Sequence, residues 1–425
     1  MKNPTAFGLL LLTLSCSAMG VSPSTSLDPS AVPIDLTVAP PEDGMGFRGK
    51  VQGQGQGQDD ELSALRASAE EEASRGMEKV QAAKKGGAPI LNAFNPRVTV
   101  FGDFIYTNAK GPILNDAGDD ISDRASLREG ELDFRADIDP VAKGVAILSF
   151  PEERPGEYAV EAEEMYVLLP GVTEGLDLKV GRFRPAFGTD NLLHTHDLPW
   201  TDRPLVVQEF LGDEGFGETG AEAKYLVPGT GSVPVELRYA LVNGESAAVL
   251  SGSGSHNQAH LGRISTFFDV GDASFLQLGT SGMYGESDLQ GGETKMLAID
   301  LLYKWRPKEE RALHSLVVQA EGFYLDRDLN GSPVKSYGMY ATLLWQQSRD
   351  LYFGVRGDWT QFADLDSGHA QAASIWASYY TSEFLRFRLG FEALDDSRKQ
   401  LDWTAFFQMT FVFGSHPAEP YWVNR

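Results

Sequence analysis

The chain has 425 residues, a formal net charge of −24 at pH 7 and 42% hydrophobic residues. Its acidic charge disfavours nucleic acid as a partner, because nucleic-acid phosphates are contacted mainly by lysine and arginine. No internal segment approaches the roughly 18 consecutive apolar residues of a membrane helix, which excludes a helical membrane protein. A membrane β-barrel is not excluded, since its strands alternate apolar and polar residues and keep the mean hydropathy low.

The first twenty residues carry the pattern of an export signal. Lys2 gives a positive start, residues 7–14 are apolar, and residues 18–20 have the small-x-small pattern that signal peptidase reads. We therefore predict a signal peptide at 1–20. Residues around Cys16 also resemble a lipoprotein box, so lipidation stays open as an alternative. Cys16 is the only cysteine, and cleavage after residue 20 would leave no thiol for a disulfide, a zinc ligand or a nucleophile.

The next two segments differ in composition. Residues 21–58 are rich in Pro, Ser, Gly and Gln, which is typical of disordered chain. Residues 59–86 are dominated by Glu, Ala, Lys and Arg, begin with acidic residues and end at a glycine pair, and so predict a helix. We interpret it as a periplasmic linker helix, with an oligomerising helix as the alternative, because its large apolar residues are few.

From about residue 94 the hydrophobic period changes to two. In one segment the apolar residues share a face, namely Leu132, Phe134, Ala136 and Ile138. The charged residues between them share the opposite face, namely Glu131, Asp133, Arg135 and Asp137. Successive side chains of a strand point to opposite sides, so this alternation predicts a strand with one apolar face. The same pattern recurs along the chain up to about residue 414.

A soluble β-sandwich would also alternate, but three features favour a membrane barrel. The expected strands are long enough for a tilted crossing, aromatic residues gather near their ends, and short turns alternate with long polar loops. We expect an all-β fold, an antiparallel transmembrane β-barrel of about 16 strands over 94–414, with the helix outside the barrel and a tail at 415–425. The expected strands lie near 97–107, 127–138, 143–151, 157–169, 176–184, 217–227, 233–242, 260–270, 273–284, 294–305, 313–325, 336–347, 350–361, 370–381, 384–394 and 401–413.

The longest stretch without alternation inside this region is 185–216, after the fifth expected strand. Together with its flanks it carries a distinctive series of motifs: Val180-Gly181-Arg182-Phe183, Phe187-Gly188, Asn191, His194-Thr195-His196-Asp197, Arg203-Pro204, Phe210-Leu211-Gly212 and a Gly-rich exit. This series resembles porin-like outer-membrane barrels of the phosphate-selective type. It is still closer to the group named zinc-regulated TonB-dependent outer-membrane receptors. The resemblance is sharpest over 175–227.

The resemblance implies an outer membrane location in a Gram-negative cell, with membrane lipid and lipopolysaccharide as partners. Sixteen-stranded porins commonly form trimers, so it also implies a homotrimer. The aromatic-rich last strand resembles the signal that the barrel-assembly machinery recognises. Energised uptake is not implied, because a TonB-dependent receptor has about 22 strands and a folded plug. Phosphate selectivity would need a lumen lined by Lys and Arg, whereas the inward faces here mix both charges.

In sixteen-stranded porins one long loop folds into the lumen, and the resemblance gives this role to 185–216. The residues expected to line the lumen or its constriction are charged: Arg182, Arg184, Asp190, Asp197, Asp202, Arg203, Glu209, Glu131, Asp133, Arg135, Asp137 and Lys179. The parity of Arg182 and Arg184 matches that of apolar Val180, which would point them outward unless a bulge or snorkelling re-aims them.

His194, His196 and Asp197 form a candidate metal site, because a His-x-His pair binds zinc when a third ligand is supplied. The alternative is a loop in which these groups hydrogen-bond to the backbone. No cofactor is expected, and the motifs of serine hydrolases, zinc proteases and P-loop proteins are missing from the sequence, so we do not expect an enzyme.

The leading hypothesis for function is a pore for diffusion of small hydrophilic solutes or ions. One alternative is a ligand- or metal-binding receptor in zinc-related uptake. Another is a plugged barrel with a structural or adhesive role.

Overall fold

The computed structural model describes residues 96–114, 118–250, 258–287, 292–307, 313–329, 331–365, 367–398 and 401–415. The predicted signal peptide, the 21–58 segment, the 59–86 helix and the tail beyond Ser415 lie outside the described residues.

The described residues form sixteen long strands and one two-residue strand. In chain order they are β1 (Arg97–Ala109), β2 (Ala125–Asp139), β3 (Ala142–Arg154), β4 (Glu157–Tyr158), β5 (Glu161–Thr173), β6 (Leu176–Phe183), β7 (Glu218–Leu226), β8 (Val235–Val242), β9 (Ala259–Asp269), β10 (Ser274–Glu286), β11 (Glu293–Trp305), β12 (Ser315–Leu329), β13 (Ser332–Gln346), β14 (Leu351–Gln361), β15 (His369–Ser382), β16 (Leu385–Asp396) and β17 (Asp402–Gly414).

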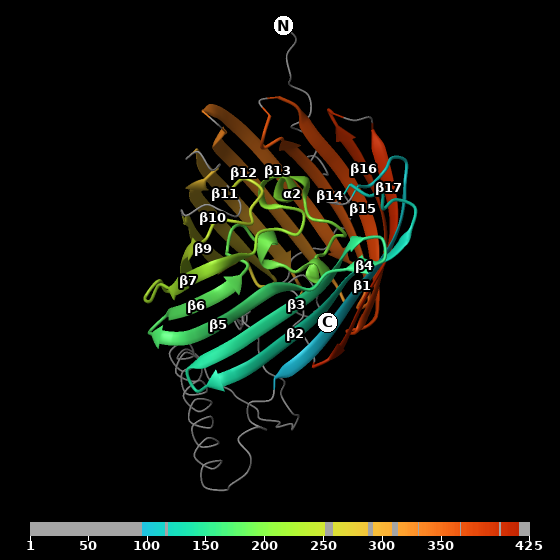
Figure 1. Cartoon of the computed structure of the whole chain (residues 1–425). Helices are drawn as coiled ribbons and strands as arrows, with labels where there is room; N and C mark the ends of the chain where they lie inside the picture. The colour runs from blue at the N-terminus through green and yellow to red at the C-terminus, as the bar shows by residue number, and fades with distance from the viewer. Residues whose placement is uncertain are drawn as a thin grey trace, which may run out of the picture. The chain divides into compact units, whose positions relative to one another are not determined.

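The sheet closes into a barrel because its first and last strands pair with each other (Figure 1). Each long strand is antiparallel to its neighbours in sequence, and β1 pairs with β17 on one side and β2 on the other. The short β4 pairs with β3. Closure leaves no unpaired edge, as a membrane-spanning sheet requires. The predicted sixteen-stranded antiparallel barrel is therefore confirmed, with the expected strand near 157–169 divided into β4 and β5.

The two faces of the barrel differ as the alternation predicts. Along β11, Thr294, Met296 and Asp300 are buried, whereas Leu297 and Ile299 between them are exposed. Exposed apolar residues continue around the outer surface on other strands, including Met339, Ile375 and Leu389. Such a band of outward apolar side chains is what contact with lipid requires. Among the described residues, no helix is both long and apolar enough to cross a membrane.

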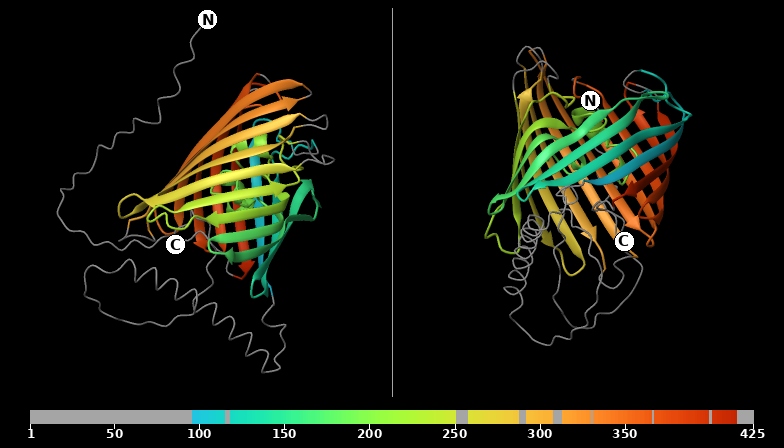
Figure 2. Two further views of the ribbon diagram at one scale, coloured as in Figure 1. Left: turned by 90° about the vertical axis from the view of Figure 1, so that its left-hand side faces the viewer. Right: turned by 60° about the horizontal axis from the view of Figure 1, so that its bottom comes forward.

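The connections at the two ends of the barrel differ in length. At the end where β1 begins and β17 finishes, most turns are short, such as residues 270–273 between β9 and β10 or 383–384 between β15 and β16. At the opposite end lie the longer connections, including 110–124 and 184–217. The tilted strands and both ends of the barrel can be followed in Figure 2. The long connection between β6 and β7, residues 184–217, is called the inner loop below.

Candidate functional site

The inner loop lies inside the barrel and crosses the lumen. It contains two short 3₁₀ turns, η2 (Asp190–Leu192) and η3 (Thr195–Asp197), and the helix α2 (Leu205–Leu211), which is visible within the barrel in Figure 1. Arg128 of β2 donates to the carbonyl of Thr201 at 3.0 Å, and Thr189 donates to Asp300 of β11 at 3.0 Å. Because β2 and β11 lie on opposite sides of the closed sheet, the loop spans from wall to wall.

Arginines on the inner wall hold the loop by its carbonyl oxygens. Arg386 of β16 donates to His196 at 3.0 Å and to Leu198 at 3.3 Å. Its neighbour Arg388 donates to Leu198 at 2.8 Å and also to Trp200. On β14, Arg356 donates to the carbonyl of Asp202 at 2.6 Å. Hydrogen bonds from a charged donor are stronger than neutral ones, so these guanidinium groups position the loop firmly.

Carboxylates on the inner wall hold the loop by its backbone amides. Glu321 of β12 accepts from the backbone N–H groups of Thr189 at 3.0 Å and Asp190 at 2.8 Å. Asp358 of β14 accepts from the N–H of Leu205 at the start of α2, at 3.2 Å. These contacts satisfy amides at the starts of η2 and α2 that have no partner within their own helices.

The loop also has an internal framework. Arg203 pairs with Asp190 at 2.7 Å and donates to the carbonyl of Leu193 at 2.5 Å, and both charged side chains are fully buried. Asn191 joins the two stems of the loop, donating to the carbonyls of Pro185 and Phe216 and accepting from the N–H of Phe216. The apolar residues of the inner loop form a core with wall residues such as Phe323 and Tyr340. They include Phe187, Trp200, Val206 and Phe210.

Two β-bulges aim extra charged residues at the inner loop. Between β1 and β2 the pairing passes from Asp103↔Glu129 to Phe104↔Leu127, which leaves Arg128 as the extra residue. Between β3 and β5 it passes from Ile147↔Glu164 to Leu148↔Ala162, which leaves Glu163 as the extra residue. Strict alternation would turn both outward, but the bulges place them against the loop.

Bulged Arg128 contacts Asp103, Thr201 and Asp202. Bulged Glu163 contacts Arg184 and His194. Bulges thus turn side chains into the lumen, as the sequence analysis considered for Arg182 and Arg184. They occur on β2 and β5, however, and not on β6.

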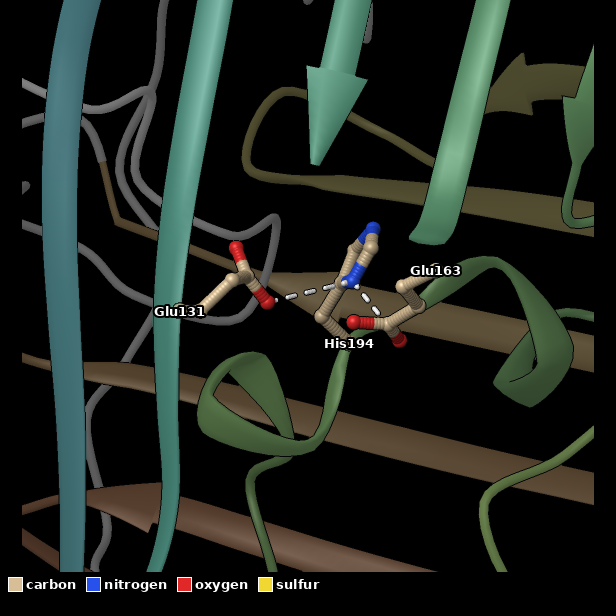
Figure 3. A group of neighbouring side chains, drawn as sticks. All are labelled: Glu131, Glu163 and His194. Atoms are coloured by element: carbon tan, nitrogen blue, oxygen red, sulfur yellow. Dashed lines mark ion pairs between the residues drawn. The ribbon is translucent and has the colours of Figure 1, made fainter. Parts of the chain in front are cut away.

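His194 lies between two wall carboxylates, Glu131 of β2 and Glu163 of β5 (Figure 3). Its Nδ1 is 3.5 Å from Glu131 Oε2 and 3.1 Å from Glu163 Oε1, and its Nε2 is 3.6 Å from Glu164 Oε2. His196 Nδ1 lies 3.3 Å from the same Glu131 oxygen. Of the described residues, Glu131, Glu163 and His194 offer ligand atoms close enough together to share one metal ion.

The two imidazoles respond to this acidic surrounding. Burial favours their neutral form, but the carboxylates of Glu163 and Glu131 outweigh it and raise the pKa of His194 well above its ordinary 6.5. For His196 the same burial is outweighed by Glu131 and Asp197, which raise its pKa to about 9. The acidic surrounding also acts on Glu214, where burial and then the nearby Glu163 raise the carboxyl pKa.

The other site residues predicted from the sequence do not form a single cluster. Asp202 pairs with Arg128, and Glu209 accepts from the N–H of Ala363. Asp197 lies next to His196, with 3.7 Å between Oδ1 and Nε2, and is not in the metal-capable group. Arg184 follows the end of β6 and turns inward to Glu163.

The strand residues of the predicted set also differ in surroundings. Asp133 and Arg135 pair with each other on the inner face of β2, whereas Asp137 is exposed near the strand end. Lys179 pairs with Glu222 of β7 at 3.7 Å. Arg182 keeps the parity of exposed Val180 and donates to the carbonyl of Ala162.

Sequence reasoning missed the wall partners of the loop. They include Arg128, Arg356, Arg386, Arg388, Glu164, Asp300, Glu321 and Asp358. Apart from Arg128, which a bulge turns inward, their signal in the sequence is a charged residue at an inward strand position. That signal cannot by itself single out those that contact the loop.

No protein-family model matches the chain. An uncharacterised protein of Aquifex aeolicus (strain VF5) is 28% identical over 344 residues, which cover 70% of each chain. The structure is similar to an anion-selective porin from Comamonas acidovorans, with a TM-score of 0.50 and 13% identity over 75% of this chain and 100% of that one. It is similar to the outer membrane channel DcaP of Acinetobacter baumannii, with a TM-score of 0.50 and 11% identity over 75% of this chain and 97% of that one. The chain thus has the fold of outer-membrane porins.

Proposed function

We propose that this protein is an outer-membrane channel through which small hydrophilic solutes or ions diffuse. The observation that carries the proposal is that charged side chains facing the lumen remain in contact with solvent. The side chain of Asp202 on the inner loop is 56% exposed, and those of Arg135 and Arg128 on the wall are 42% and 23% exposed. A barrel packed solid by its loop would bury these charges, whereas a water-filled passage beside the loop keeps them hydrated.

The charge of the lumen supports a broad solute range rather than phosphate selectivity. Several wall arginines are engaged with the backbone of the inner loop, so they are not arranged as a free ladder of positive charge. The solvent-exposed inward groups include both signs, Asp202 beside Arg128 and Arg135 beside Asp133. Solute diffusion is then limited mainly by the width of the lumen that the inner loop leaves open.

The proposal places the protein in the outer membrane of a Gram-negative cell, where its outward apolar residues contact lipid and its longer loops meet lipopolysaccharide. Export by the 1–20 segment, insertion by the barrel-assembly machinery and a homotrimeric state belong to the same proposal. The protein transports and does not catalyse. Membership of the phosphate-selective porin type or the zinc-regulated receptor group rests on the motifs of 175–227 alone.

Swelling of proteoliposomes in iso-osmotic solutes of increasing size tests the proposed channel. The refolded chain should admit small sugars and amino acids rapidly and exclude larger oligosaccharides. The control is the same protein heat-denatured before reconstitution. If a fully folded barrel gives no swelling with any solute, the protein is not a diffusion channel.

A further inference from the structure

Three segments distant in sequence bring metal-ligating groups to one point. Glu131 comes from the middle of β2, Glu163 from the bulge of β5 and His194 from the inner loop (Figure 3). The Nδ1 of His194 lies 3.5 Å from the Glu131 oxygen and 3.1 Å from the Glu163 oxygen. Ligands about 2.1 Å from a tetrahedral metal ion are roughly 3.4 Å apart. The two distances from His194 are therefore close to those between ligands in a coordination shell, and all three groups offer ligand atoms within 4.8 Å of one another.

Several buried polar atoms in this cluster lack a hydrogen bond of regular geometry, although its carboxylates and imidazoles lie within ion-pair distance. They are Glu131 Oε2, Glu163 Oε2, His194 Nδ1 and His196 Nδ1. The Glu131 side chain is 2% exposed and that of His196 is 6% exposed, so water does not reach them freely from outside. Buried polar atoms are nearly always hydrogen-bonded, so this group has unused capacity to bind a water molecule or an ion.

The surroundings favour a cation and orient its imidazole ligand. Glu164 approaches the second ring nitrogen of His194 at 3.6 Å, the place where a carboxylate commonly orients a metal-bound histidine. Arg184 holds Glu163 from the other side. Glu129 and Glu214 are two further carboxyl groups close to Glu163.

We propose that Glu131, Glu163 and His194 bind one divalent transition-metal ion of the zinc type. One imidazole nitrogen with two carboxylate oxygens is a borderline donor set that favours Zn²⁺, Co²⁺ or Ni²⁺ over Mg²⁺ and Ca²⁺, which prefer oxygen alone. Three protein ligands leave the fourth tetrahedral position to a ligand from outside the protein, such as water. Because the ligands come from two wall strands and the loop, the bound ion fastens the inner loop to β2 and β5.

Cobalt titration of the purified full chain in detergent tests this site without any transport measurement. Co²⁺ in a tetrahedral site of mixed nitrogen and oxygen ligands gives visible absorption bands, and zinc should displace it. The wild-type chain should bind one Co²⁺ saturably. The isosteric Glu163→Gln and the truncated His194→Ala should each weaken binding by tenfold or more, and Glu164→Gln should weaken it by about tenfold, as loss of an outer partner does.

The matched control is His260→Ala, which removes an exposed histidine whose partner is Tyr239 on the outer wall. It should bind Co²⁺ like the wild type. Circular dichroism and heat-modifiable gel migration confirm that each variant is a folded barrel, and Glu163→Gln serves if His194→Ala does not fold. No saturable binding by the wild type, or equal affinity in wild type and folded Glu163→Gln, would overturn the site. Neither result depends on whether the barrel conducts.

Discussion

Replacing Arg203 by alanine should loosen the inner loop while leaving the barrel intact. The guanidinium of Arg203 pairs with Asp190 at 2.7 Å and donates to the carbonyls of Asp190 and Leu193. Both charged side chains are fully buried, so the variant leaves the Asp190 carboxylate without its counter-charge. Breaking a buried pair in this way costs about 3–5 kcal/mol. The cost falls on local opening of the loop, because the strands keep all their ladder hydrogen bonds.

Hydrogen exchange followed by mass spectrometry measures this opening directly. At 1.4 kcal/mol per tenfold, a loss of about 3 kcal/mol speeds exchange of the amides in 189–204 by about a hundredfold. Arg182→Ala is the matched control, since that arginine lies on the outward face of β6 and contacts only the carbonyl of Ala162 among the hydrogen bonds described. Exchange unchanged within a few-fold would show that the Arg203–Asp190 pair does not hold the loop closed. So would a uniform rise across the strands, because Arg203 would then support the barrel and not the loop.

Three further variants test other parts of the structure. Arg386→Ala/Arg388→Ala removes guanidinium bonds to three loop carbonyls, so single-channel recordings should show a larger and noisier conductance; an unchanged trace would mean that the loop is held elsewhere. Ile299→Lys puts a charge at the middle of the outer face of β11 and should destabilise the barrel by about 2–4 kcal/mol in lipid, measured by urea unfolding in bilayers; a loss below 1 kcal/mol would contradict lipid contact at this position. In Gly338→Leu the new side chain would collide with Val206 of α2. Overpacking costs about 1–3 kcal/mol, so amide hydrogen exchange in 205–211 should rise roughly tenfold. Unchanged exchange in 205–211 would contradict the close packing of α2 against β13.

The strands could be predicted from sequence because each face of a barrel accepts a different kind of residue. Lipid admits only apolar side chains such as Leu297 and Ile299, and the lumen admits Asp300 and Lys304, so the period of two is visible directly. The same rule indicates the inner loop, since 185–216 is where alternation stops for longest. The inner loop packs its apolar residues around Trp200 and Phe210 and does not form a strand. Its apolar and polar residues therefore do not follow a period of two.

Parity fails where one extra residue enters a strand. Alternation counted along β5 turns Glu163 outward with Met165, and only the pairing with β3 reveals that it is a bulge residue. Arg128 on β2 is hidden from sequence reasoning in the same way. A bulge depends on how the partner strand is spaced, which a single strand's sequence does not contain.

The partners of the loop are hidden for another reason. Arg386 and His196 are 190 residues apart, and their contact exists only because closing the sheet brings β16 beside η3. The candidate metal site shows the same limit. The His-x-His motif draws attention to Asp197 as the nearest carboxylate in sequence, whereas the structure brings Glu131 and Glu163 to His194 from the wall.

We propose that the inner loop crosses an open lumen and sets its width. Single-channel conductance in planar bilayers, compared between the wild type and a variant with residues 190–212 replaced by a short Gly-Ser linker, tests it most directly. The wild type should show discrete openings, and the variant should show a several-fold larger unit conductance. A folded wild-type barrel that never conducts, or two proteins with equal conductance, would contradict it.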